Sequence, residues 1–367
     1  MQRVVLFFKE LGPKRLFFGV VTLLIIIGAI IVLLNREPEI DPKFQEAFNN
    51  SSYDVIIKGL EERIYSGEKD PTILKAVSAA YIQKALLGER KKARQSISVA
   101  LSYLQSIVRF YKNDDEAYRL LGQAYLVLQD YQKAEENYKK AISINPRNAE
   151  AHAGLGIINE NKGDTDAASR NYREAKRVDP NNETSVLGMA RIKLSSNNSR
   201  ETISLSSQLI QSGNKSIRQG AYMTLGSGYT LAKKPNQALE AYKEAAKLGS
   251  NDPHLYVLTA QAYINQYLSY VRVNNLEPMA KNALAETEKA LKIDPTYIYA
   301  YTTQHRIYMM LKDKESAQRV GNKIISLLPK DKNLTAEQKK FYADYYKKVP
   351  TVTITDIKVG TTTVRSK

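Results

Sequence analysis

A period of 34 residues constrains the fold of this chain more than any other feature of its sequence. Residues 115–148 read DEAYRLLGQAYLVLQDYQKAEENYKKAISINPRN, and the following residues repeat the same spacing of aromatic, small and proline residues. Leu121, Tyr125 and Leu128 stand four and three residues apart, which places them on one face of a helix. Pro146 cannot continue a second helix, because it lacks a backbone N–H. The period therefore predicts a hairpin of two helices in each unit.

The shared positions indicate the kind of repeat. They hold Tyr118, Leu121, Gly122, Tyr125, Ala134, Tyr138, Ala141 and Pro146 in the first unit, and His152, Leu155, Gly156, Ala168, Tyr172, Ala175 and Pro180 in the second. This spacing resembles that of the tetratricopeptide repeat (TPR) family. The resemblance implies an all-α fold, a right-handed helical solenoid, whose members generally bind other proteins. Since one helix pair cannot bury its apolar stripe alone, neighbouring pairs must stack on one another.

The repeat continues along the chain with uneven strength. A TPR array is predicted at residues 115–330, and residues 183–216 within it keep the length of a repeat but lose most of its marks. Residues 53–114 are predicted to form a helical cap and a degenerate TPR unit. One later unit exceeds the 34-residue repeat by about eleven residues. That excess predicts a longer first helix and a projecting hairpin near residues 264–278.

The C-terminal end of the array is predicted to carry a capping helix at residues 331–349. This helix contains Phe341, Tyr342, Tyr345 and Tyr346. The four aromatic side chains either seal the exposed end of the last repeat or form a patch that binds a partner. Residues 350–367 alternate β-branched residues as a strand does. They form either a disordered tail or a segment that pairs with something else.

The N-terminal region is predicted to anchor the chain in a membrane. Residues 16–34, LFFGVVTLLIIIGAIIVLL, carry no charge and are long enough for a transmembrane helix. A secretory signal peptide is the alternative, but its apolar region is usually shorter and ends in a small-x-small cleavage site. Residues 1–15 carry the basic flank, so they are expected in the cytoplasm. Residues 35–52 then form a linker to an extracytoplasmic TPR domain, in a layout typical of the bacterial cell envelope.

The charge balance favours an acidic partner or an anionic surface. The chain has 54 Lys and Arg against 38 Asp and Glu, a formal net charge of +16. A solvated, Lys-rich exterior is the plainer interpretation. No dense basic cluster appears, the nearest being Lys91, Lys92 and Arg94, so nucleic acid is an unlikely partner. The oligomeric state is left open by the sequence.

The sequence does not indicate an active site. The chain has no cysteine, which excludes disulfides, thiolate zinc sites and cysteine nucleophiles. His152, His254 and His305 are scattered over different units, and no phosphate-loop, dinucleotide, zinc or calcium motif is present. Nothing brings together a nucleophile, a base and an oxyanion site. We therefore expect no catalytic residue, no cofactor and no metal site.

The resemblance to the TPR family implies a partner-binding groove lined by the first helix of each unit. Carrying over the positions between the packing residues gives a lining that mixes cationic, amide and apolar groups. Its candidate members are Arg119, Gln123, Val127, Ile157, Asn161, Arg191, Met223, Gln261, Asn265 and Arg306. Arginine is suited to bidentate recognition of carboxylates. Such a lining fits an extended peptide or a helix.

One subclass of TPR domain does not fit. Chaperone-docking TPR domains clamp a terminal carboxylate with Lys, Asn and Arg at fixed places in three consecutive repeats. The equivalent places in this chain are occupied by Arg119 and Gln123, Gly154 and Ile157, and Thr184 and Gly188. The departure weakens the expectation of a cytosolic chaperone receptor, including an import receptor with an N-terminal anchor.

These observations lead to two functional hypotheses. The first is a membrane-tethered, non-enzymatic adaptor or scaffold that binds a protein or peptide in its concave groove, in envelope assembly or protein translocation. The alternative is a basic solenoid that binds an anionic envelope polymer or lipid surface. Salt dependence distinguishes the two hypotheses, because contacts between exposed charges weaken as ionic strength rises.

Overall fold

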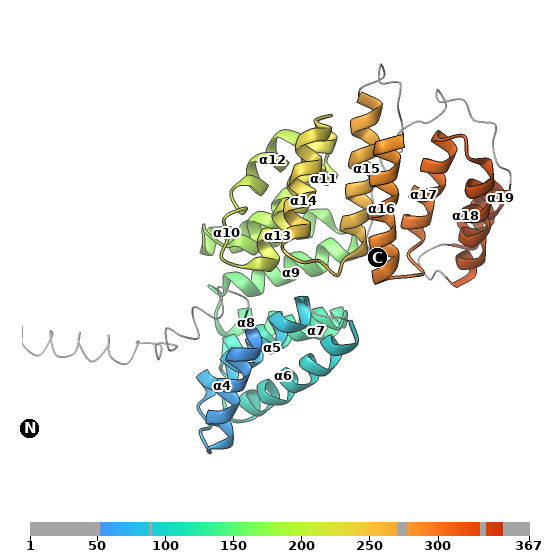
Figure 1. Cartoon of the computed structure of the whole chain (residues 1–367). Helices are drawn as coiled ribbons and strands as arrows, with labels where there is room; N and C mark the ends of the chain where they lie inside the picture. The colour runs from blue at the N-terminus through green and yellow to red at the C-terminus, as the bar shows by residue number, and fades with distance from the viewer. Residues whose placement is uncertain (1–51, 88–89, 270–276, 331–334, 348–367) are drawn as a thin grey trace, which may run out of the picture. The chain divides into compact units, whose positions relative to one another are not determined.

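The computed structural model describes residues 52–87, 90–269, 277–330 and 335–347 (Figure 1). All of them belong to one compact unit, Phe48–Lys367. The predicted membrane span at residues 16–34 and the tail at 350–367 lie outside the described residues. Among the helices that are described, none combines the length and the apolar character needed to cross a bilayer.

The described residues are α-helices joined by short connections, with one 3-10 turn and no strand, which confirms the all-α prediction for this part of the chain. In chain order, the elements are α4 (Tyr53–Tyr65), α5 (Pro71–Leu87), α6 (Arg90–Phe110), α7 (Asp115–Val127), α8 (Tyr131–Ile144), α9 (Ala149–Lys162), α10 (Thr165–Val178), α11 (Glu183–Ser195), α12 (Ser199–Ser207), α13 (Lys215–Leu231), α14 (Pro235–Lys247), α15 (Pro253–Ser269), α16 (Glu277–Ile293), α17 (Ile298–Met310), α18 (Lys314–Leu327), η1 (Leu328–Lys330) and α19 (Ala336–Lys347). Successive helices from α5 to α18 pair as hairpins, as a helical solenoid requires.

Three details differ from the sequence-based expectations. The extra residues of the long unit do not lengthen its first helix alone, because α15 and α16 each contain 17 residues. In the unit at 183–216 the second helix, α12, ends at Ser207, so Leu209 reaches its buried position from the connection that follows. Leu128 does not extend the buried face of α7, since it is the C-cap residue and is exposed.

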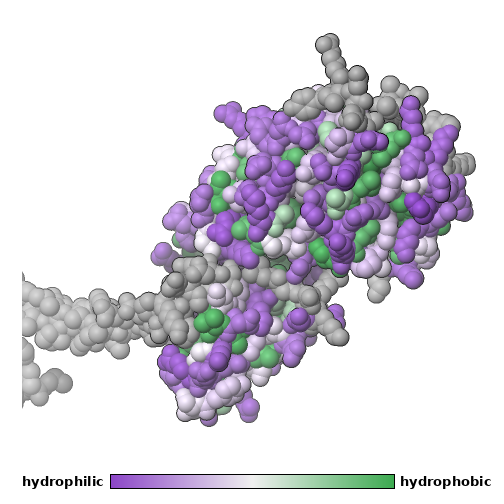
Figure 2. Space-filling model, in the orientation of Figure 1, coloured by the Kyte–Doolittle hydropathy of each residue, from purple (hydrophilic) through white to green (hydrophobic). Residues whose placement is uncertain are grey.

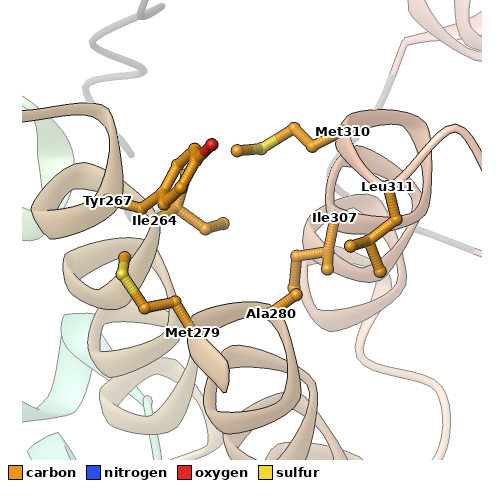
Figure 3. Close-up of a pocket in the computed structure, with 7 residues that line it drawn as sticks. All are labelled: Ile264, Tyr267, Met279, Ala280, Ile307, Met310 and Leu311. Carbon is orange, nitrogen blue, oxygen red and sulfur yellow. The ribbon is translucent and has the colours of Figure 1, made fainter. Parts of the chain in front are cut away.

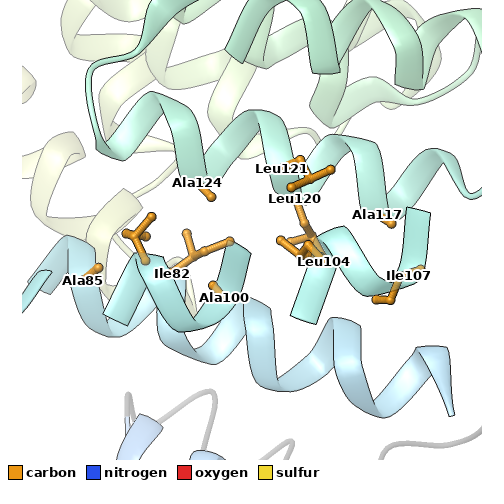
Figure 4. Packing of buried hydrophobic residues seen from close by; sticks show 10 residues of the cluster. Ile82, Ala85, Ala100, Leu104, Ile107, Ala117, Leu120, Leu121 and Ala124 are labelled. Atoms are coloured by element: carbon orange, nitrogen blue, oxygen red, sulfur yellow. The ribbon is translucent and has the colours of Figure 1, made fainter. Parts of the chain in front are cut away.

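The core of the degenerate first unit is built by α5, α6 and α7 (Figure 4). Ile82, Ala100, Leu104 and Ile107 are fully or almost fully buried there, and Leu120 of α7 joins them. The long amphipathic α6 thus supplies the apolar stripe that one hairpin cannot bury by itself. On the face seen in Figure 2, hydrophilic residues dominate and hydrophobic residues are scattered among them.

Polar caps connect neighbouring units at two joints of the array. Asn148 accepts a hydrogen bond from the backbone N–H of Ala151 at 2.9 Å, which caps α9. The other end of the same side chain donates to Oδ2 of Asp115 in the preceding unit at 2.8 Å. Asn182 repeats the arrangement one unit later by donating to Oε1 of Glu150 at 2.6 Å. One residue thus begins a helix and fixes its position against the neighbouring unit.

Tyrosine rings pack between glycines at the joints of the best-preserved units. A Cβ atom on Gly122 would lie 2.7 Å from Cδ1 of Tyr138, and one on Gly154 would lie 2.3 Å from Cζ of the same ring. Tyr172 is held in the same way by the next pair of glycines. Because real Cβ atoms do not approach that closely, the glycines are needed for the rings to fit between two first helices. This is the physical basis of the small and aromatic positions in the period.

The last unit reverses this size pattern. His305 occupies the position at which glycine stands in the well-preserved units, and Gly321 occupies the position of the packing tyrosine. His305 is buried, and its ring meets that of Tyr346 from α19 edge-on at 4.9 Å. Tyr346 therefore helps to seal this end. Phe341 and Tyr345 remain 66% and 47% exposed, so the aromatic residues of α19 divide between packing and surface.

Candidate protein-binding face

The first helices of successive units lie along one side of the stack. Contacts between first helices link α5 with α7, α7 with α9, α9 with α11, α11 with α13, α13 with α15, and α15 with α17. Within the described residues, no comparable contact joins the second helices of neighbouring units. The first helices approach one another more closely than the second helices do. The inner side of each bend in the stack is therefore formed by first helices.

All ten predicted groove residues lie on first helices, and all ten are half-buried. Their hydrogen bonding differs, because some of these side chains are already bonded within the chain. The Asn161 side chain donates to the carbonyl oxygen of Ile157, one turn earlier on α9, at 2.9 Å. The three groove arginines differ most from one another.

Arg191 on α11 is held by a carboxylate of the preceding unit. Its Nε donates to Oε1 of Glu160 at 2.7 Å, and its Nη2 donates to Oε2 of the same residue at 2.8 Å. The Tyr172 hydroxyl donates to Oε2 of Glu160 at 2.7 Å and lies 3.4 Å from Nη2 of Arg191. This bidentate pair joins α9 to α11. The guanidinium of Arg191 is therefore part of the repeat-to-repeat contact.

Arg119 on α7 is also paired within the chain. Its Nε donates to Oε2 of Glu116 at 2.7 Å, its Nη2 pairs with Oε1 of Glu116, and its Nη1 donates to Oε1 of Gln123 at 3.2 Å. Glu150, on the next first helix, contributes a further negative charge near Arg119. The cationic character predicted for this part of the groove is thus balanced by carboxylates on the same helix and the next.

Glu150 and Glu160 have opposite pKa shifts. Burial raises the pKa of Glu150, and the charge of Arg119 and the hydrogen bonds from Asn182 and Thr184 only partly oppose it. Burial also acts to raise the pKa of Glu160, but the hydrogen bonds and charge supplied by Arg191, with the hydroxyl of Tyr172, outweigh it and lower the pKa. A bidentate guanidinium partner accounts for the difference. Glu160 is therefore a stably ionised partner for Arg191.

Among the residues that the structure describes, Arg306 on α17 has no such partner. Its Nε and Nη2 atoms are buried and make no hydrogen bond. Burial lowers the pKa of this guanidinium from its ordinary value, with no carboxylate to oppose the effect. Buried polar groups are nearly always satisfied in folded proteins, so an unbonded guanidinium is unusual. Of the three groove arginines, Arg306 alone has buried guanidinium nitrogens that make no hydrogen bond to the described residues.

A small apolar pocket lies at the junction of α15, α16 and α17 (Figure 3). Its walls are formed by Ile264, Tyr267, Met279, Ala280, Ile307, Met310 and Leu311. Two methionines give the pocket adaptable walls, because the thioether side chain is flexible. Among the described residues, no group of His, Asp and Glu side chains is arranged to hold a metal ion.

Two acidic residues of this face, Glu116 and Glu150, were missed by the sequence-based choice of groove residues. Glu116 precedes Arg119 by three residues, a spacing at which side chains meet on a helix and which could have indicated the pair. Glu150 gave no such signal, because the residues it bonds to are Asn182 and Thr184 in the next unit. A contact across units depends on how two first helices are placed, which a single repeat does not reveal.

Comparison with known proteins agrees with this geometry. Two profiles described as tetratricopeptide repeat match residues 115–148 and 137–168. The chain is a tetratricopeptide repeat protein. Its TPR solenoid resembles the APC/C hetero-tetramer Cut9–Hcn1 with a TM-score of 0.60 at 14% identity, covering 83% of this chain and 54% of that one. At this level of identity the likeness shows the fold alone.

Further similar proteins differ widely in what their names describe. A human IFIT1 dimer solved with m7Gppp-AAAA has a TM-score of 0.53 at 14% identity, covering 83% of each chain. The DnaJ homolog subfamily C member 7 homolog of Dictyostelium discoideum is 28% identical over 130 residues. That match covers 33% of this chain and spans only 23% of the relative. The TPR fold is shared across these proteins, and what each one binds stays a property of that protein.

Proposed function

We propose that this TPR protein is a membrane-tethered, non-enzymatic adaptor that holds a protein segment against its first helices. The observation that carries the proposal is the continuous series of contacts between first helices from α5 to α17. These contacts place side chains from many units along one side of the stack, where one extended segment can touch several of them. TPR solenoids commonly use such extended concave surfaces for binding.

The proposed site of action is the cell envelope, with the array on the outer side of the cytoplasmic membrane. The support is the uncharged run at residues 16–34 and the basic residues that precede it. Envelope assembly and protein translocation are processes in which a tethered adaptor of this kind would act. This assignment rests on the layout of the chain.

The alternative proposal is a basic solenoid that binds an anionic envelope polymer or lipid surface. Its support is the net charge of +16 together with exposed cations on second helices, such as Arg170 and Arg173 of α10. Binding of that kind would depend on total charge and fall steeply with added salt. The adaptor proposal instead makes binding depend on the face formed by the first helices.

The orientation is tested with reporters fused after Lys367 in the full chain. We expect a reporter that is active only outside the cytoplasm to be active, because the basic flank of residues 1–15 should remain inside. A reporter that is active only in the cytoplasm is the matched control, and it should be silent. The reverse pattern would place the array in the cytoplasm and contradict the envelope proposal.

A further inference from the structure

Two of the three histidines lie at contacts made by α17, the first helix of the last unit (Figure 1). His254 is on α15, and its Nδ1 atom lies 3.2 Å from the hydroxyl oxygen of Tyr297, the N-cap residue of α17. His305 is on α17 itself, where its buried ring meets that of Tyr346 on α19. An imidazole is thus present where α17 meets the preceding unit and where it meets the terminal helix.

The contact between α15 and α17 differs from the corresponding contact upstream. At the joint of α9 with α11, the N-cap residue Asn182 donates a hydrogen bond to Glu150, the second residue of α9. At the joint of α15 with α17, the N-cap residue is Tyr297 and the second residue of α15 is His254. A carboxylate is therefore replaced by an imidazole, the side chain whose charge ordinarily changes between about pH 5 and 8.

The surroundings of His254 favour its neutral form. Burial lowers the pKa of His254, and the charge of Asp252, just before α15, only partly opposes the shift. Among the described residues, no charged side chain of α13, α14, α16 or α17, the helices packed on α15, contributes to that shift. Burial, with the charges of Asp252 and Asp294 and the nearby Tyr299, raises the pKa of Tyr297, so its hydroxyl stays neutral. An imidazolium has a hydrogen on both ring nitrogens, so Tyr297 could no longer donate to it.

The surroundings of His305 are less favourable still to a charged ring. Its Nε2 atom is buried and makes no hydrogen bond to the described residues. The ring faces Tyr346 of α19, whose pKa is raised by burial and by Tyr345 and Tyr342, and it lies against Gly321 of α18. Burial lowers the pKa of His305, and no described charged group on these helices opposes the shift. Protonation would therefore place a charged N–H in the interior without an acceptor.

We propose that α17, α18 and α19 form an acid-sensitive end of the array, which loosens from the preceding units when His254 and His305 take up protons. Both histidines bind a proton less readily in the folded chain than in the unfolded one. The stability that they contribute is thus present above the unfolded pKa of about 6.5 and is lost as the pH falls below it. The inference goes beyond the adaptor function and does not depend on it.

The lack of cysteine makes one introduced thiol a unique reporter of local opening. Ala317→Cys places the thiol on α18, and Ala134→Cys places it on α8; both alanines are fully buried and are the fourth residues of their helices. The full chain with either substitution is treated with a thiol reagent at about pH 7.5 and about pH 5.5, on either side of the unfolded pKa of histidine. The Ala134→Cys rate at each pH corrects for ionisation of the thiol.

We expect the corrected labelling rate of Ala317→Cys to rise at least about tenfold at the lower pH. One pH unit below the unfolded pKa, each histidine that is protonated on opening raises the open population by up to about tenfold. His254→Gln alone, at a half-buried position, should reduce the rise at least about threefold, and His254→Gln with His305→Leu should reduce it to about twofold or less. His152→Gln, on α9, is the matched control and should keep the full rise.

The comparison of the two pH values, with all three histidines in place, decides the inference even if a variant fails to fold. Equal corrected rates at both pH values would overturn it. Helical circular dichroism at about pH 7.5 identifies the variants that are folded. A full rise that persists in folded His254→Gln and in the folded double variant would also overturn the inference, because another group would then be responsible. Loss of the rise in His152→Gln would overturn the assignment to α17.

Discussion

Tyr172→Ala lowers the free energy of unfolding by about 3–5 kcal/mol, the usual cost of emptying a buried aromatic site. Tyr172 is fully buried, and its ring fills the space between Gly156 and Gly188 on two successive first helices. Its hydroxyl also donates to Glu160, the residue that holds Arg191. The substitution therefore leaves a cavity at a joint between units and weakens the ion pair across it. Chemical denaturation of the full chain, followed by helical circular dichroism, measures the loss.

Tyr172→Phe is the matched control, because it keeps the ring and removes only the hydroxyl. We expect it to cost about 1.5 kcal/mol, the contribution of one hydrogen bond to a charged group. Equal destabilisation by the Phe and Ala variants would mean that the ring does not fill the joint. The packing between glycines described for this position would then be incorrect.

Gly122→Leu has the second large effect, through overpacking. A Cβ atom at residue 122 would lie 2.7, 2.8 and 2.9 Å from the Cδ1, Cε1 and Cγ atoms of Tyr138. A leucine requires still more room, so either the ring or the helix must move. Overpacking of this kind typically costs about 1–3 kcal/mol. Because each unit stacks on its neighbours, the loss should spread to the adjacent hairpins.

A double-mutant cycle shows whether the clash involves Tyr138. Gly122→Leu combined with Tyr138→Ala should be less destabilised than the sum of the two single variants, by about 1 kcal/mol or more. Gln132→Leu introduces the same side chain at an exposed position of α8 and should change stability little. Strict additivity of the two core substitutions would show that Gly122 and Tyr138 do not meet.

The 34-residue period predicted the packing between helices, because the residues that pack together stand at fixed distances within each repeat. Gly122, Tyr138 and Ala141 recur at fixed distances, so their small and large sizes could be matched from the sequence alone. His305 and Gly321 were harder to interpret, because their sizes are exchanged together and each one looks like a departure from the pattern by itself. The distribution of the extra residues between α15 and α16 was also not predictable, since either helix could have been extended without breaking the period.

The sequence predicted which helices carry the candidate groove residues, but not the contacts that those residues make. Arg119, Arg191 and Arg306 were chosen by the same rule, and the structure gives two of them carboxylate partners within the chain. Those partnerships depend on which side chain the adjacent first helix presents. Glu160 is the twelfth residue of α9, whereas the twelfth residue of α15 is Ile264. Simultaneous removal of all three arginines would thus disturb the fold as well as the groove.

The central claim is that the first helices form the protein-binding face, and photocrosslinking in native membranes tests it most directly. A photoreactive residue replaces Met223 or Gln261, which are half-buried on α13 and α15, in otherwise intact full-length chains. Gln132 and Lys139, exposed on the second helix α8, are the matched control positions. We expect Met223 and Gln261 to yield the same discrete protein adduct, and the two positions on α8 to yield none. Equal adducts from both helix sets, or adducts from α8 alone, would contradict the assignment of the binding face.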